Sequence, residues 1–208
     1  MKNEVLKEKI KLFWEWFVVN EALMRDVVKD ELHDGRAELV NAIDNQVLNF
    51  GMFTWEIAEE KNASFSFTIS PNGNIELLQI SKGIMKNAPI LSHWQFNYAK
   101  PAKDWNFQFN VFDDYANEHC IDASAWKFIL LPYPHNKTKL IIEAKNIIHL
   151  DDNTKDSAGD YVLTHTLGEE YKINNIAAIE IVNEFESQFQ DSYVSIIDLQ
   201  KRFIATID

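Results

Sequence analysis

Three glutamates and one histidine are the residues of this 208-residue chain best placed to do chemistry. Glu56 and Glu180 lie in stretches that alternate apolar and polar residues, which is typical of strands, and both stand on the polar side. Two carboxylates about 5–10 Å apart support glycoside hydrolysis or proton abstraction. If the strands are neighbours, these carboxylates converge on one sheet face; if not, they are spread over a solvated face.

His165 and Glu169 form a second candidate pair. They lie four residues apart in a segment, 159–170, that we expect to be helical, so both side chains could face one ligand or exchange a proton. The alternative is an ordinary pair on the surface of a helix near its C-terminal end.

Aromatic residues are dense in the middle of the chain, and the candidates for a binding surface are Trp55, Trp94, Tyr98 and Trp105. Such residues build binding platforms, but they also build cores. Trp105 stands beside Asp104 in an expected loop, so we predict that it is the most exposed of the four.

Several kinds of site are absent from the sequence. No two of the six glycines are separated by two or four residues, which excludes the dinucleotide-binding fingerprint and the nucleophile-elbow motif. Histidines are never closer together than 14 residues, which excludes a local pair of histidine ligands on one helix. The acidic stretch that starts at Asp151 is not a calcium loop, because it has Asp156 where such a loop needs glycine and Val162 where it needs glutamate. We therefore expect no metal site and no cofactor.

A single cysteine, Cys120, cannot form an internal disulfide, which fits a reducing compartment. It follows His119, but neighbouring residues on a strand point to opposite faces, so a dyad needs an irregular backbone. We expect Cys120 to be buried and inert.

The chain carries a formal net charge of −12, and −8 of it falls in the last 58 residues. Nucleic-acid binding needs a clustered excess of Lys and Arg, so this charge argues against it. An acidic C-terminal third could face a basic partner protein or simply keep the chain soluble. The middle hundred residues are nearly neutral, at −1, so a small-molecule site is expected there.

Residues 1–9 contain no apolar h-region, so we expect no secretory signal, and the most apolar early stretch, 12–19, is interrupted by Glu15. It is far shorter than the roughly 20 apolar residues of a membrane span. We therefore expect a cytoplasmic protein without membrane contact.

Apolar periodicity predicts one α+β domain over 1–208. It begins with a helical pair in 1–50, whose helices cover 3–29 and 36–50. A first ββαβ-like unit follows in 51–113, with a helix capped by Asn74 and an extra strand, and we expect the strands 94–98 and 107–111 to pair as a hairpin. A second such unit spans 126–183, and a helix capped by Ser195 closes the chain over 195–207. The strands are expected to form a mainly antiparallel sheet, and whether the two units are a true repeat stays open.

A series of short motifs occurs in a familiar order: Trp14 with Trp16-Phe17, Trp55-Glu56-Ile57, Ile69-Ser70-Pro71-Asn72-Gly73, Asn87-Ala88-Pro89 with His93-Trp94, Leu167-Gly168-Glu169-Glu170, and Ile179-Glu180-Ile181. Over about residues 13–182 this pattern resembles a family of uncharacterised bacterial cytoplasmic proteins of unknown function. The resemblance implies a bacterial origin and an α+β architecture. It also nominates Glu56 and the segment 167–169 as positions to inspect.

Two functions follow from these observations. The first is a non-catalytic, acidic binding or interaction protein whose partner is a basic protein or a small molecule. The alternative is a small-molecule hydrolase that uses Glu56 with Glu169 or Glu180 in an aromatic-lined cleft. The sequence leaves the oligomeric state open.

Overall fold

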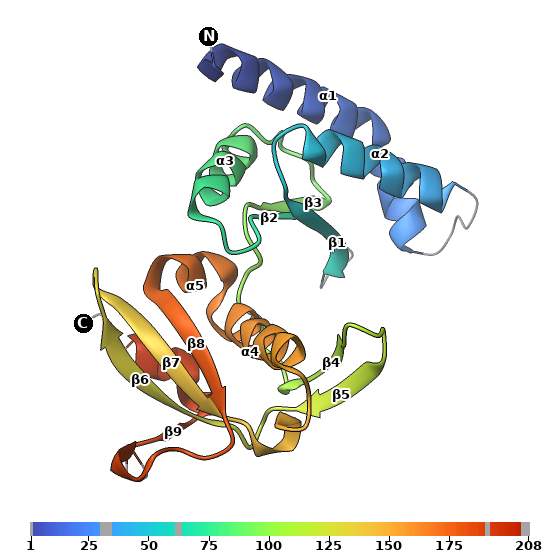
Figure 1. Cartoon of the computed structure of the whole chain (residues 1–208). Helices are drawn as coiled ribbons and strands as arrows, with labels where there is room; N and C mark the ends of the chain where they lie inside the picture. The colour runs from blue at the N-terminus through green and yellow to red at the C-terminus, as the bar shows by residue number, and fades with distance from the viewer. Residues whose placement is uncertain (1, 30–34, 61–63, 190–191, 205–208) are drawn as a thin grey trace. The chain divides into compact units, whose positions relative to one another are not determined.

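The structure is a computed structural model that describes residues 2–29, 35–60, 64–189 and 192–204. By their internal contacts the residues form two compact units, which we call unit 1 (residues 1–100) and unit 2 (residues 101–208). Figure 1 shows the elements of both units. The sequence-based prediction of a single α+β domain stays a prediction, and the units are described separately below.

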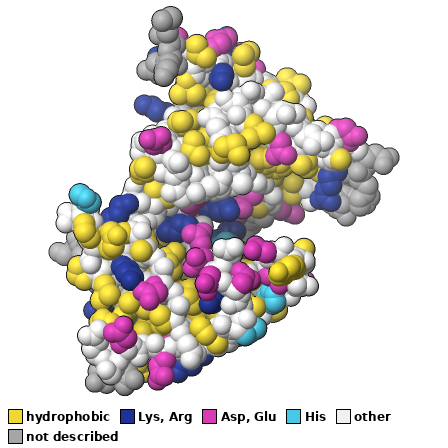
Figure 2. Space-filling model, in the orientation of Figure 1, with side chains coloured by type: hydrophobic (Ala, Val, Ile, Leu, Met, Phe, Trp, Pro, Cys, Tyr) yellow, Lys and Arg dark blue, Asp and Glu magenta, His cyan; other side chains and the backbone are white. Residues whose placement is uncertain are grey.

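Both units expose apolar side chains among charged ones, as the face drawn in Figure 2 shows. Over the described residues, the most exposed large apolar side chains are Ile90 and Val19 in unit 1 and Tyr115 in unit 2. Most other large apolar side chains are buried in two separate clusters, one in each unit.

Unit 1 starts with the expected helical pair and continues with a three-stranded sheet in the order β1-β2-β3. Strands β1 and β2 are antiparallel, and β3 lies parallel to β2. The elements are α1 (Lys2–Val28), α2 (Arg36–Leu48), β1 (Thr54–Glu60), β2 (Ser64–Ser70), α3 (Ile75–Lys86) and β3 (Trp94–Asn97). Asn74 caps α3 as expected, because its side chain accepts the backbone N–H groups of Glu76 and Leu77.

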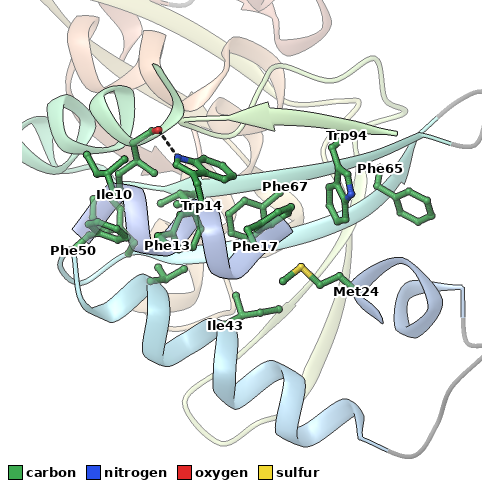
Figure 3. Packing of buried hydrophobic residues seen from close by; sticks show 14 of the residues in the cluster. Ile10, Phe13, Trp14, Phe17, Met24, Ile43, Phe50, Phe65, Phe67 and Trp94 are labelled. Atoms are coloured by element: carbon green, nitrogen blue, oxygen red, sulfur yellow. Dashed lines mark hydrogen bonds between the residues drawn. The ribbon is translucent and has the colours of Figure 1, made fainter. Parts of the chain in front are cut away.

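The core of unit 1 is aromatic (Figure 3). Phe13 and Phe17 of α1 face Phe67 of β2, with ring centroids 6.1 and 5.2 Å away. Trp14 keeps its polar edge satisfied because its Nε1 donates to the carbonyl of Ile84 at 3.0 Å. The apolar residues of α1 therefore form one side of the unit 1 core, against the sheet.

Unit 2 contains a two-stranded sheet, β4-β5, and a four-stranded sheet in the order β8-β7-β6-β9. Its elements are β4 (Gln108–Phe112), β5 (Glu118–Asp122), β6 (Lys127–Tyr133), β7 (Lys137–Glu143), the 3₁₀ turn η1 (Lys145–Ile147), α4 (Asp152–Leu167), α5 (Glu169–Asn175), β8 (Ile176–Val182), η2 (Ser187–Phe189), β9 (Val194–Ser195), η3 (Ile196–Asp198) and α6 (Leu199–Ile204). Trp126 and Phe128 are fully buried at its centre.

Helix α4 lies very close to β8. A Cβ placed on Gly159 would stand 3.0 Å from Cδ1 of Ile181 and 3.3 Å from Cγ2 of Ile179. Glycine at this position therefore allows the helix to approach the strand.

The two ββαβ-like arrangements predicted from the sequence are present, one in unit 1 and one in unit 2, and they share one topology. In unit 1, β1 and β2 form a hairpin, and α3 returns the chain to β3, parallel to β2. In unit 2, β6 and β7 form a hairpin, and α4 and α5 return the chain to β8, parallel to β7. The α+β class, the helical pair and the C-terminal helix are confirmed.

The pairing of strands differs from the prediction in one place. Strands 94–98 and 107–111 do not form a hairpin: β3 pairs with β2, and β4 pairs with β5. As a result the strands form three sheets rather than one. The helix between β2 and β3 explains the first pairing, because a helical crossover joins parallel strands.

Two further expectations were wrong. Cys120 is exposed rather than buried, because it lies opposite Asn110 on the side of β5 that faces away from the buried Ile121. Ser195 precedes η3, but its side chain makes no capping hydrogen bond.

The end of the expected closing helix, over 205–207, lies outside the described residues. In the four described ranges, no helix combines the length and the apolar character needed to cross a bilayer.

Candidate functional site

Unit 2 contains a cavity of about 440 Å³, which we call the Trp105 pocket. It is lined by a loop, the end of α4, and the η3–α6 segment. The lining residues are Ala102, Lys103, Asp104, Trp105, Phe107, Thr166, Ile197 and Gln200. A volume of this size lies within the range of small-molecule sites, about 300–1,000 Å³.

Backbone hydrogen bonds hold the loop that carries Trp105. The N–H of Lys103 donates to the carbonyl of His165 at 2.7 Å, which attaches the loop to the last turn of α4. Phe107 adopts φ 63°, and its carbonyl accepts the N–H of Ala123 at 2.8 Å. The loop therefore has a defined position although it contains no regular element.

Trp105 stands in a group of aromatic rings. Its ring centroid lies 4.8 Å from that of Phe107 and 5.4 Å from that of His165. His165 in turn stacks on Tyr161 at 3.8 Å, and its Nδ1 lies 2.9 Å from the carbonyl of Tyr161. Trp105 is half-buried by this packing, as are Trp55 and Tyr98, so the prediction that it is the most exposed of the four aromatic residues stays a prediction.

Two polar atoms of the pocket residues are buried without partners. They are Nε1 of Trp105 and Oγ1 of Thr166, and no other buried side-chain nitrogen or oxygen in the described part of the chain lacks a hydrogen bond. Thr166 as a residue is 94% buried, because its exposed fraction is 6%. A buried polar group without a hydrogen bond costs about 1–3 kcal/mol, so two of them beside one cavity require a physical reason.

Gly168 separates the two members of the predicted His165–Glu169 pair. It adopts φ 83°, a left-handed value, and ends α4 at Leu167, so that Glu169 begins a new helix, α5. His165 and Glu169 therefore lie on different helices, and the helical geometry that would place side chains four residues apart on one face does not apply to them. Glu169 is 2% exposed, whereas His165 is half-buried against Tyr161 and Trp105.

The other predicted catalytic residues occupy separate elements. Glu56 is half-buried on β1 of unit 1. Glu180 lies on β8 of unit 2, exposed, where its Oε2 is 2.6 Å from Nζ of Lys139. Neither the Trp105 pocket nor the unit 1 cavity described below is lined by any of these carboxylates. Their catalytic role stays a prediction.

The aromatic residues of unit 1 that we predicted to bind a ligand pack in its core or contact polar side chains of the same unit. Trp94 is 9% exposed, and its Nε1 donates to Glu21 at 2.8 Å. Trp55 packs against the core and donates to Asp44 at 2.6 Å, and the Tyr98 ring lies 5.4 Å from Nζ of Lys82. Trp94 is therefore a core residue, which is the alternative that we considered for these aromatic residues.

A second cavity, of about 590 Å³, lies along α1 of unit 1. Its walls are mainly apolar and include Ile10, Trp14, Val18 and Pro89, with Lys7 and Lys11 at its margin. Trp14 already donates its Nε1 to Ile84. This groove therefore contains no unsatisfied group of the kind found in the Trp105 pocket.

Acidic side chains gather around α4 and the β4–β5 hairpin on the face of unit 2 drawn in Figure 2. The start of α4 contacts the hairpin turn, because Asn153 donates to Asp114 at 3.1 Å. Within the turn, hydrogen bonds from Asn117 and His119 hold the pKa of Asp113 well below its usual range. No group of three or more His, Cys, Asp or Glu side chains within the described ranges is arranged to hold a metal ion.

No family model, curated protein or solved structure matches the chain. Sequence reasoning nominated Trp105 and His165 but missed Thr166, Ile197 and Gln200. No local sequence motif identifies these three residues, because they lie on α4, η3 and α6 and come together only in the folded chain.

Proposed function

We propose that the protein is a non-catalytic binding protein and that unit 2 binds a small organic molecule in the Trp105 pocket. The observation that carries the proposal is the pair of unpartnered buried groups at this cavity, the indole N–H of Trp105 and the hydroxyl of Thr166. A ligand that accepts a hydrogen bond from each of them removes the penalty that the unliganded fold bears.

Access to these groups requires a small rearrangement. Each of the two atoms exposes less than 1 Å² of surface, so a ligand reaches them only after a lining side chain turns aside. Gln200 and Lys103 are exposed and can rotate at little cost. The rigid part of the site is the aromatic group around Trp105, and the adaptable part is its polar margin.

Binding fits this geometry better than catalysis. The pocket has one carboxylate in its lining, Asp104, and lacks the second one that the predicted hydrolase mechanism needs. Glu56, Glu169 and Glu180, on which the hydrolase alternative depends, line neither of the two cavities described above. We further propose a bacterial cytoplasmic protein, on the composition and the motif resemblance given above.

A thermal-shift screen of a metabolite library tests the proposal with two threonine variants of the full chain. Thr166→Val keeps the shape of the side chain and removes the hydroxyl. Thr138→Val, on β7 and outside the pocket lining, is the matched control. We expect at least one compound that stabilises the wild type and Thr138→Val equally and binds Thr166→Val about tenfold more weakly, which corresponds to one hydrogen bond.

Two results would contradict the proposal. In the first, no compound stabilises the wild type at all. In the second, every compound that does so stabilises Thr166→Val to the same extent, which would place binding elsewhere in the molecule.

A further inference from the structure

The polar groups of the Trp105 pocket differ in what they can offer a ligand. The indole Nε1–H of Trp105 only donates, and the hydroxyl of Thr166 can donate as well as accept. Lys103 adds an ammonium group to the same lining. Three residues that carry donors, one of them cationic, line one cavity of about 440 Å³, and the two neutral donor atoms lie buried behind its surface.

A carboxylate matches this set of donors. It has two oxygens with about four acceptor sites and one negative charge, and a hydrogen bond to a charged acceptor is roughly twice as strong as a neutral one. A neutral carbonyl can occupy the same donors, but it carries no charge and so forms no ion pair with the ammonium group of Lys103.

The remaining lining residues limit the rest of the ligand. Lys103 is the one cationic side chain of this lining and Asp104 adds a negative charge, so a second carboxylate on the ligand meets repulsion that no further cation offsets. Phe107 and Ile197 supply apolar surface, and 55% of Ile197 is exposed. The cavity therefore favours one anionic group attached to an apolar body.

We infer that the ligand of the Trp105 pocket is a small organic monocarboxylate, whose carboxylate pairs with Trp105, Thr166 and Lys103 while its carbon chain packs on Phe107 and Ile197. This inference rests on the proposed function and specifies its ligand.

The test follows the indole N–H signals of the ¹⁵N-labelled full chain by NMR at pH 7. Trp105→Phe identifies the Trp105 signal among those of the six tryptophans. Three probes are titrated: 4-methylpentanoate, its neutral amide, and the dicarboxylate 3-methylglutarate. We expect the monocarboxylate to shift the Trp105 signal saturably, with a dissociation constant at least tenfold lower than those of the other two probes.

Two lysine variants extend the test. Lys103→Met should weaken monocarboxylate binding about tenfold and weaken amide binding much less, because only the monocarboxylate loses an ion pair. Lys145→Met is the matched control, because Lys145 is an exposed lysine of unit 2 outside the pocket lining, and it should change neither.

The outcomes separate this inference from the proposed function. If the amide or the dicarboxylate binds as tightly as the monocarboxylate, the inference is wrong and the binding function stands. If a compound from the thermal-shift screen moves the Trp105 signal and no probe does, the inference is again wrong alone. If neither the probes nor any screened compound moves it, both proposals are wrong.

Discussion

Asp113 organises the turn between β4 and β5 through a single carboxylate. Its Oδ1 accepts the backbone N–H groups of Tyr115 and Asn117, at 2.9 and 2.8 Å. Its Oδ2 accepts the side-chain amide of Asn117 at 2.9 Å and lies 3.0 Å from Nε2 of His119. These donors favour the ionised form, so the pKa of Asp113 lies well below its usual range.

The lowered pKa of Asp113 predicts how the protein responds to acid. A folded-state pKa below the unfolded value gives stability that is present at neutral pH and is lost as the pH falls below about 4. Asp113→Asn should therefore lower the urea midpoint at pH 6.5, and the difference from the wild type should shrink at pH 3. An equal difference at both pH values would contradict this assignment.

Single residues also show where sequence reasoning stops. Trp105 could be nominated from the sequence, because an aromatic residue in a polar loop is a recognisable signal. Thr166 could not, since its interest lies in a missing hydrogen bond, and that depends on every neighbour that α4 brings near it. Cys120 shows the converse: its type suggested burial, while its register on β5 exposes it.

Two glycines within helices, Gly83 and Gly159, have different surroundings, so we predict opposite effects on stability when each is replaced by alanine. Gly83 of α3 has no atom within 4 Å of an added Cβ, whereas an added Cβ on Gly159 of α4 meets Ile181 at 3.0 Å. Gly83→Ala should raise the free energy of unfolding by about 0.5–1 kcal/mol, because alanine is the better helix former. Gly159→Ala should give no gain and a loss of up to about 1–2 kcal/mol, because the crowding outweighs that preference.

Urea unfolding of both variants measures these differences, and Gly83→Ala serves as the matched control for Gly159→Ala. An equal rise in stability for the two variants would show that α4 can move away from β8 without loss.

Elements were more predictable than their pairing. Apolar periodicity identified the helical pair, the helix capped by Asn74 and most strands, because it reports which face of an element is buried. It cannot report which strand lies alongside, so β3 was assigned to the wrong neighbour. The break at Gly168 was likewise missed, because the flanking residues on both sides suit a helix.

At the scale of the whole molecule, charge is the dominant feature. A net charge of −12 on 24.2 kDa, with acidic side chains gathered around α4, opposes folding through self-repulsion. Raising NaCl from 10 to about 150 mM shortens the Debye length from about 30 to about 8 Å and screens that repulsion. The melting temperature should therefore rise with salt.

A charge variant provides the control for this prediction. Asp156→Asn with Glu184→Gln removes two exposed negative charges of unit 2 and should reduce the rise in melting temperature. A melting temperature that is independent of salt, or that falls, would show that the repulsion is already balanced locally.

We propose that the two unpaired polar groups at the Trp105 pocket of unit 2 serve to bind a ligand. The most direct test compares the free energy of unfolding of Thr166→Val with that of the wild type, first without ligand and then with the best compound from the screen. We predict that the variant is more stable by about 1 kcal/mol without ligand, because it no longer buries an unpaired hydroxyl, and that it gains less from the ligand. A variant that is less stable without ligand and gains as much as the wild type would contradict the account.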